Sequence, residues 1–169
     1  HLAPIAQEIT SQLPAGFSPA LLGLTPQGWL RGWDSEGRVS PRKWLDAEAS
    51  LNRAGAVVFS VEDVEGDEEL IEELSLACRV LALTEGDEGA RLYWNNDLRR
   101  FSAPEEKVVD STGAGDIFAT AFFIRLHSTR DPWEAARFAT CLASKSVARR
   151  GLESIPTYEE IQFCQMEVL

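Results

Sequence analysis

Asp116 follows Gly113-Ala114-Gly115 at the start of a strongly apolar segment that runs to about residue 127. Small residues before a helix let backbone N–H groups approach an anion without obstruction from side chains. The positive end of the helix dipole strengthens that attraction. A carboxylate beside such an anion hole can take the proton of an attacking hydroxyl during phosphoryl transfer. The same residues also fit a structural turn in which Asp116 only caps the helix electrostatically.

The composition predicts a folded and acidic protein. Hydrophobic residues make up 44% of the 169 residues and charged residues 25%, which is ordinary for a globular domain with one core. The 16 Lys and Arg against 27 Asp and Glu give a net charge of −11, so the surface repels polyanions and no nucleic-acid partner is expected. The pairs Arg99-Arg100 and Arg149-Arg150 fit solvated surface charge or local contacts with a small phosphorylated ligand.

Three cysteines, Cys78, Cys141 and Cys164, show no Cys-x-x-Cys spacing. Their odd number argues against a disulfide framework and a structural zinc site, and it favours a reducing cytoplasm. No run approaches about 18 apolar residues, and no basic region precedes an apolar stretch at the N-terminus, so neither a membrane span nor an export signal is expected. The first residues read as the end of a strand that runs into a helix, which predicts that the chain begins within a fold.

Strand-like and helix-like segments alternate along the chain. Short apolar runs bounded by turn residues predict buried strands at residues 20–24, 56–59 and 80–84, and a hairpin pairs residues 90–94 with 98–101 around a turn at 95–97. The alternation predicts an α/β architecture with a mainly parallel sheet and helices on both faces. Spacing and capping residues predict helices at residues 4–13, 42–53, 115–127, 132–150 and 157–167, and a further helix after the acidic stretch 62–73.

The loop after the first strand, residues 26–39, contains Trp29 and Trp33 among glycines. Large aromatic side chains on a loop can line a ligand pocket, contact a partner surface or cap the edge of a sheet. The sequence leaves these alternatives open.

The segment Asp110-Ser111-Thr112-Gly113-Ala114-Gly115-Asp116, followed by an apolar helix, closely resembles the C-terminal signature of ribokinase-like (pfkB-type) carbohydrate kinases. Residues 83–90 resemble the family's Thr-x-Gly-x-x-Gly nucleotide loop, and residues 138–147 and 149–157 resemble its adenine-side helix and closing loop. The resemblance covers most of residues 1–169. It implies the C-terminal, nucleotide-binding and catalytic portion of a ribokinase-like fold, with the N-terminal substrate and lid portion absent from this chain.

The resemblance assigns roles to single residues. Asp116 is implied as the catalytic base, and the amides of residues 113–115 as the anion hole. Thr84, Gly86 and Gly89 are implied to lie near the nucleotide. Thr140 stands where family members commonly carry an asparagine near the adenine, which leaves the nucleotide specificity open.

Metal sites are also implied by the resemblance. Asp110 and Thr112 resemble the start of a site for a monovalent cation such as K⁺, which Gly151 and Ser154 would complete. Family members often carry Asn-x-x-Glu near magnesium, where this chain reads Ser60-Val61-Glu62-Asp63, so Asp63 is the candidate carboxylate for Mg²⁺.

The resemblance therefore implies an ATP-dependent phosphotransferase that moves the γ-phosphoryl group to an alcohol of a sugar or polyol, with Mg²⁺. The tryptophan loop looks similar to that of inositol-kinase-like members. A nucleoside or vitamin kinase of the same fold and a non-catalytic nucleotide-binding module are the alternatives, and a homodimer is left open. Without an acceptor-binding segment, the 169-residue chain by itself is expected to show no kinase turnover.

Overall fold

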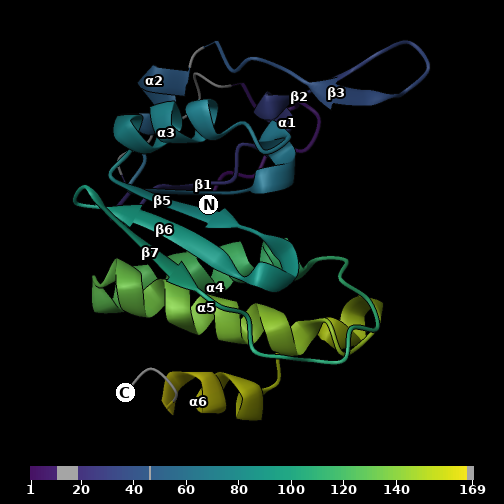
Figure 1. Ribbon diagram of the computed structural model, residues 1–169, viewed down its shortest axis with the longest axis vertical. Coiled ribbons are helices and arrows are strands. Elements are labelled where there is room, and N and C mark those ends of the chain that lie inside the picture. The colour runs from purple at the N-terminus through teal and green to yellow at the C-terminus, as the bar shows by residue number, and fades with distance from the viewer. Residues whose placement is uncertain (11–18, 46, 167–169) are drawn as a thin grey trace. The chain divides into compact units, whose positions relative to one another are not determined.

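The computed structural model of the protein describes residues 1–10, 19–45 and 47–166. The main sheet has the strand order β1-β4-β5-β6-β7, and β1 pairs in parallel with β4 (Figure 1). The α/β class predicted from the sequence is therefore confirmed. The five strands are β1 (Gly23–Leu24), β4 (Ala56–Ser60), β5 (Val80–Thr84), β6 (Ala90–Trp94) and β7 (Asp97–Phe101).

The chain divides into two compact units, one of residues 1–83 and 93–97 and the other of residues 84–92 and 98–169. The core of the first unit forms because β4 and β5 are apolar on both faces, as strands of a parallel sheet are. Two of its helices are α2 (Ala47–Leu51) and α3 (Glu68–Ala77). Side chains less than 2% exposed in this core include Leu24, Leu51, Val57, Ile71, Leu81 and Leu83.

Two helix predictions in the first unit differ from the structure: one helix is absent from the described residues, and the other is shorter than predicted. Residues 4–10 contain no helix, because the Glu8 carboxylate accepts the N–H groups of Ile5, at 2.9 Å, and Ala6, at 2.6 Å, and so holds a tight turn. The Pro4 carbonyl accepts from Gly28 N–H at 2.8 Å, which ties the segment to another loop. Residues 11–13 of the predicted helix lie outside the described residues. Of the helix predicted at 42–53, only α2 forms within the described part.

The tryptophan loop contains regular structure that the sequence did not reveal. It forms α1 (Gln27–Leu30) and a separate antiparallel pair, β2 (Arg31–Trp33) with β3 (Val39–Pro41). Trp29 is a core residue: its ring lies 5.0 Å from that of Trp44, and its Nε1–H donates to the Ile9 carbonyl at 2.7 Å. Packing in the core of the unit therefore accounts for Trp29, whereas Trp33 is 41% exposed.

The second unit is built on α4 (Ala114–Thr129) and α5 (Pro132–Ser146), which pack along each other, and α6 (Tyr158–Met166), which lies against α5 (Figure 1). Phe122 is fully buried and stacks on Phe118 with ring centroids 6.0 Å apart. A left-handed residue, Arg130, ends α4, and Asp131 caps α5 by accepting N–H groups of its first turn. The guanidinium of Arg99 lies 4.2 Å from the ring centre of Trp133.

The connections of the second unit agree closely with the predictions from the sequence. The predicted capping box at α6 is confirmed, since Thr157 N–H donates to the Glu160 carboxylate at 2.8 Å and Glu160 N–H donates to Thr157 Oγ1 at 3.3 Å. A short 3₁₀ helix, η4 (Gly151–Ser154), precedes it. The hairpin turn is shorter than predicted, because the left-handed conformations of Asn95 and Asn96 make the reversal and β7 already begins at Asp97.

The cysteine argument against a disulfide is wrong. Cys141 of α5 and Cys164 of α6 form a disulfide, with Cα atoms 5.8 Å apart, and Cys78 is free. Burial raises the pKa of the Cys78 thiol to about 12. The pair could not be read from spacing, because 23 residues separate its members and only the packing of the two helices brings them together.

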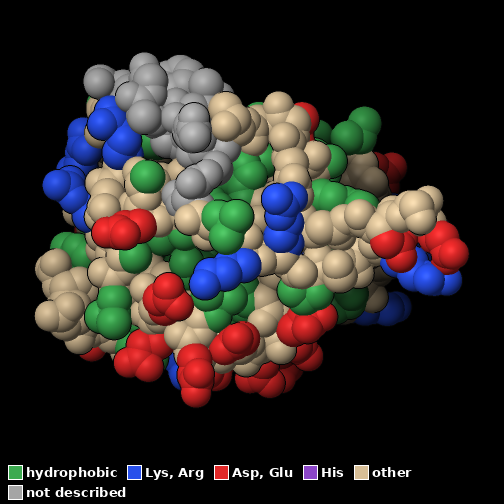
Figure 2. Space-filling view, turned by 90° about the horizontal axis from the view of Figure 1, so that it is seen from above, with side chains coloured by type: hydrophobic (Ala, Val, Ile, Leu, Met, Phe, Trp, Pro, Cys, Tyr) green, Lys and Arg blue, Asp and Glu red, His purple; other side chains and the backbone are tan. Residues whose placement is uncertain are grey.

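The surface agrees with the acidic composition. On the face shown in Figure 2, acidic side chains gather in a band, and the basic side chains are scattered. No helix among the described residues is long and apolar enough to cross a membrane.

The cap of α5 gives a test of the second unit. Replacing Asp131 with alanine leaves the N–H groups of Trp133 and Glu134 without their acceptor, at 2.9 and 3.2 Å. We expect the free energy of unfolding in urea to fall by about 1 kcal/mol. Glu72→Ala, at an exposed position within α3, is the control and should change it by less than about 0.5 kcal/mol. Equal effects would show that the cap does not hold the helix.

Candidate active site

The start of α4 is shaped by Gly113, whose φ of 84° lies in the left-handed region that favours glycine. The first helical hydrogen bond of α4 runs from Ile117 N–H to the Gly113 carbonyl at 2.9 Å, so the N–H groups of Gly115 and Asp116 have no acceptor within the helix. A Cβ added at Gly115 would meet no atom within 4 Å. The Ala114 N–H already donates to the Ser111 carbonyl at 3.1 Å, so it is less available to an anion than the expected hole requires.

Asp116 lies in the first turn of α4 and is exposed. Among the residues that the structure describes, its carboxylate has no hydrogen-bond or ion-pair partner, and it makes no side-chain cap on the helix. It therefore points a free carboxylate outward beside the open amide groups. This geometry suits a group that must accept a proton from a ligand.

Asp110 connects the loop before α4 to the loop before α6. Its Oδ1 accepts the Thr112 N–H at 3.0 Å, and its Oδ2 accepts the Gly151 N–H at 3.3 Å. Ser154 Oγ donates in turn to the Gly151 carbonyl at 2.6 Å. All four residues expected at a monovalent-cation site are thus linked through one hydrogen-bond network.

The same contacts set the charge of Asp110. The N–H and hydroxyl of Thr112, then the Gly151 N–H, hold the pKa of the Asp110 carboxyl below its ordinary value, and Arg150 adds a smaller effect. A depressed pKa means that the ionised form is favoured in the folded protein. The contacts therefore persist at every pH above the ordinary pKa of a carboxyl group. They are lost only as the pH falls through the lowered pKa of Asp110.

Thr84 ends β5, and Gly86 and Gly89 lie in the loop that follows it. Its turn is closed by the Glu85 N–H, which donates to the Gly89 carbonyl at 2.8 Å, and it contains the 3₁₀ helix η3 (Gly86–Glu88). Glu85 also pairs with Arg91, at 2.9 Å, and with Arg100, at 3.1 Å. These ion pairs anchor the loop to β6 and β7, so Gly86 and Gly89 lie in one ordered turn directly after Thr84.

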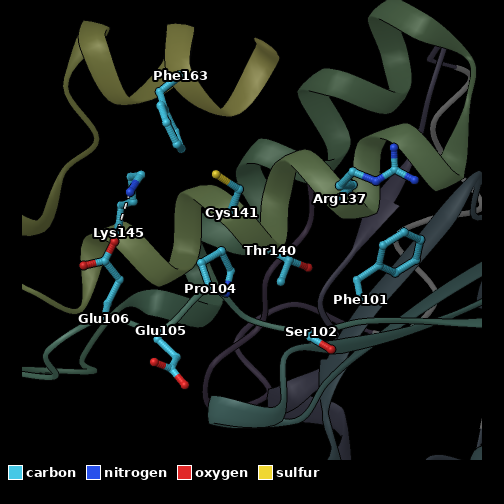
Figure 3. Close-up of a pocket in the computed structure, with 10 residues that line it drawn as sticks. All are labelled: Phe101, Ser102, Pro104, Glu105, Glu106, Arg137, Thr140, Cys141, Lys145 and Phe163. Atoms are coloured by element: carbon cyan, nitrogen blue, oxygen red, sulfur yellow. Dashed lines mark hydrogen bonds and ion pairs between the residues drawn. The ribbon is translucent and has the colours of Figure 1, made fainter. Parts of the chain in front are cut away.

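A cavity of about 310 Å³ lies in the second unit beside Thr140 (Figure 3). Thr140 is buried, and its hydroxyl donates to the Ala136 carbonyl at 2.9 Å, which leaves the oxygen able to accept. Lys145 pairs with Glu106 at 3.0 Å across one side. The lining residues are Phe101, Ser102, Pro104, Glu105, Glu106, Arg137, Thr140, Cys141, Lys145 and Phe163.

Asp63 lies in the first unit and is 5% exposed. Its Oδ1 pairs with Arg31 at 2.6 Å, and its Oδ2 accepts the Ser60 N–H at 2.9 Å in the cap of the 3₁₀ helix η2 (Val61–Val64). Both oxygens thus accept from protein donors. Its role as a magnesium ligand stays a prediction, and no group of three or more His, Cys, Asp or Glu among the described residues could hold a metal ion.

Sequence reasoning missed most of the cavity. Arg137, Cys141 and Lys145 line it together with Thr140, at the spacing of one face of α5. That periodicity was present in the sequence, but it also fits a helix face packed in the core. Phe163 comes from α6, and nothing in the sequence places α6 against this face.

The chain belongs to the pfkB family of carbohydrate kinases: the family model matches residues 46–158, which include the Asp116 segment and the loop after β5. The resemblance seen in the sequence is thereby confirmed at the level of the family.

Relatives and solved structures agree with this membership. Ribokinase of Bacillus subtilis (strain 168) is 36% identical over 92 residues, which are 54% of this chain and 31% of that protein. A ribokinase structure from Thermotoga maritima matches 98% of this chain and 56% of its own with a TM-score of 0.74 at 23% identity. A putative ribokinase II from E. coli, solved with ATP and Mg²⁺, matches 71% of this chain and 42% of its own with a TM-score of 0.62 at 23% identity. The chain therefore spans about a third to a half of the length of these proteins.

Two glycines of the loop after β5 provide a matched pair of variants. At Gly89, with a φ of 102°, an added Cβ would lie 2.0 Å from the Phe101 carbonyl oxygen, whereas at Gly86, with a φ of 62°, it would meet no atom within 4 Å. We expect the free energy of unfolding in urea to fall by about 1 kcal/mol for Gly86→Ala and by at least about 3 kcal/mol for Gly89→Ala. The larger loss is expected because only Gly89 adds a backbone clash to its strained φ. Equal costs would mean that the loop is not packed as described.

Proposed function

We propose that this chain supplies the nucleotide-binding and catalytic portion of an ATP-dependent kinase that phosphorylates an alcohol group of a sugar or polyol. The observation that carries the proposal is the free, exposed carboxylate of Asp116 beside the open N–H groups at the start of α4.

The proposed reaction is an in-line transfer of the γ-phosphoryl group. The acceptor oxygen forms a bond to phosphorus as the bond from phosphorus to the bridging β,γ oxygen breaks, and ADP leaves. Asp116 takes the hydroxyl proton of the acceptor late in this step, so its contribution comes mainly from position. The N–H groups of Gly113, Gly115 and Asp116, with the dipole of α4, stabilise the negative charge of the phosphoryl oxygens.

The nucleotide is assigned to the second unit. We place the phosphates at the start of α4 and near the loop of Thr84, Gly86 and Gly89, and the base in the cavity beside Thr140. The family membership and the ATP and Mg²⁺ complex of the E. coli relative support ATP as the donor. A buried hydroxyl and two aromatic rings, Phe101 and Phe163, fit the lining expected of a site for a planar base.

The proposed site would use two cations, Mg²⁺ and a monovalent cation. Mg²⁺ commonly binds through phosphate oxygens, one or two carboxylates and water, so it would be held largely by the nucleotide itself and would neutralise phosphate charge. Asp63 remains the candidate carboxylate toward it. A monovalent cation would be held at the network of Asp110, Thr112, Gly151 and Ser154, where it would order the loop before α4 without touching the substrate.

The first prediction from this proposal concerns Asp116 as the catalytic base. In the full-length protein, Asp116→Asn should lower turnover about 10²-fold or more and change ADP affinity little, because the proton acceptor is lost while the amide groups remain. Turnover is measured by ADP release with sugars, inositols and nucleosides as acceptors. Asp131→Asn is the control, since asparagine also caps a helix. Activity of the Asp116 variant within a factor of a few of wild type would contradict the assignment.

The second prediction concerns the amide groups. Gly115→Val places a branched side chain in the open space before the N–H groups, so ADP affinity measured by calorimetry should fall about tenfold or more. Gly115→Ala, with only a methyl group, should have a smaller effect. Circular dichroism checks that both variants are folded. If the two affinities match that of wild type, the start of α4 does not bind phosphate.

The third prediction concerns the monovalent cation. Replacing a large organic cation by K⁺ at constant ionic strength should raise turnover severalfold, and Asp110→Ala should remove that response. The depressed pKa of Asp110 keeps the carboxylate charged throughout neutral assay conditions, so the K⁺ response should not vary between about pH 6 and pH 8. A response to total salt alone would exclude the site.

A further inference from the structure

The disulfide between α5 and α6 adjoins the cavity assigned to the nucleotide base. Cys141 is 6% exposed and Cys164 is 0% exposed, and Cys141 itself lines the cavity. Phe163, the neighbour of Cys164 in sequence, lines the opposite wall, as Figure 3 shows. The bond therefore joins α5, which forms one wall, to α6, which contributes Phe163, while residues from the segment 101–106 line the rest of the cavity.

The attachment of α6 depends strongly on this bond. Among the described residues of α6, only Cys164 is buried, and a helix of nine residues is marginal in water without tertiary contacts. The other contacts are partly exposed: Arg149 donates to both carboxylate oxygens of Glu160, at 2.5 and 2.8 Å, and Lys145 Nζ lies 4.6 Å from the ring centre of Phe163. Contacts of this kind contribute about 1 kcal/mol each at a partly exposed site.

The free cysteine offers no competing partner. Cys78 lies at the end of α3 in the first unit, where its Sγ donates to the Leu74 carbonyl at 2.8 Å. Its raised pKa, about 12, keeps the thiol protonated and poorly reactive. Oxidation and reduction at neutral pH would therefore act on the pair Cys141 and Cys164.

We propose that Cys141 and Cys164 form a reversible thiol switch that controls nucleotide affinity. In the disulfide form α6 is held on α5 and Phe163 completes the cavity. In the dithiol form α6 separates part of the time, the wall is lost, and the nucleotide binds more weakly. This proposal rests on the assignment of the cavity to the nucleotide.

The chemistry of the switch is thiol–disulfide exchange. A thiolate of the pair attacks a low-molecular-weight disulfide such as oxidised glutathione and releases one glutathione thiol. The second cysteine then displaces the other, so two electrons and two protons leave the protein and two glutathione thiols are formed. Because both sulfur atoms are buried, exchange requires α6 to open first, which makes the reaction slow and dependent on that motion.

The test compares the full-length protein after treatment with dithiothreitol and with oxidised glutathione. Alkylation under denaturing conditions and mass spectrometry of the peptides should find Cys78, Cys141 and Cys164 all alkylated in the reduced form, and of these three only Cys78 alkylated in the oxidised form. Hydrogen exchange of residues 158–166 should be faster in the reduced form. Calorimetry with ADP should give about threefold to tenfold weaker binding for the reduced form, because only the closed fraction binds well.

Variants separate the switch from general redox effects. Cys164→Ala should bind ADP as the reduced wild type does and should ignore oxidised glutathione. Cys78→Ala is the matched control and should keep the full redox response. Hydrogen exchange of α4 and α5 checks that the Cys164 variant remains folded, and the comparison of the two wild-type forms needs no variant.

The switch would be overturned by Cys141 and Cys164 still alkylated after treatment with oxidised glutathione, by equal exchange of α6 in the two forms, or by a redox response retained by Cys164→Ala. Equal ADP affinities with unequal exchange would also overturn it, because α6 would move without affecting the site. If neither form binds ADP, the assignment of the cavity to the nucleotide fails, and the exchange of α6 still decides whether the disulfide holds the helix.

Discussion

The candidate site depends on one carboxylate that holds two loops together. Asp110 accepts from Thr112, in the loop that leads into α4, and from Gly151, in the loop that leads toward α6. These contacts fix the approach to Gly113, and Gly113 fixes where the first turn of α4 begins. Asp116 and the open amide groups are placed by that turn. The position of the proposed base is thus set by a hydrogen-bond network that never touches the reacting atoms.

The acidic charge of these 169 residues favours such a local arrangement. A net charge of −11 repels polyanions such as the proposed nucleotide at long range, so the proposed site relies on short-range donors. Backbone N–H groups at a helix start provide such donors without adding side-chain charge, and their dipoles are fixed before a ligand arrives. Several basic side chains of the second unit form structural ion pairs: Arg91 and Arg100 contact Glu85, and Arg149 contacts Glu160. The proposed phosphate site at the start of α4 therefore relies on backbone N–H groups.

Sequence reasoning succeeded where a local pattern decides the structure and failed where packing decides it. The apolar strands, α4, α5 and the capping box of α6 follow from periodicity and neighbouring residues, and so does the Gly113 turn. The first ten residues carry helical spacing, but the Glu8 carboxylate captures their amide groups and no helix forms there. The disulfide was missed for a related reason, because its two cysteines meet only when α6 packs on α5. The helix start could thus be predicted as part of a site, whereas the cavity beside Thr140 could not.

Trp133 gives the protein a built-in optical probe. It is the single tryptophan of the second unit, and the other four belong to the first. The guanidinium of Arg99 lies 4.2 Å from the centre of its ring, so the environment of this tryptophan depends on the packing of β7 against α5. Replacing Trp133 with phenylalanine and subtracting the two spectra isolates the fluorescence of the second unit. Unfolding of the second unit can then be followed separately from that of the first, without an attached label.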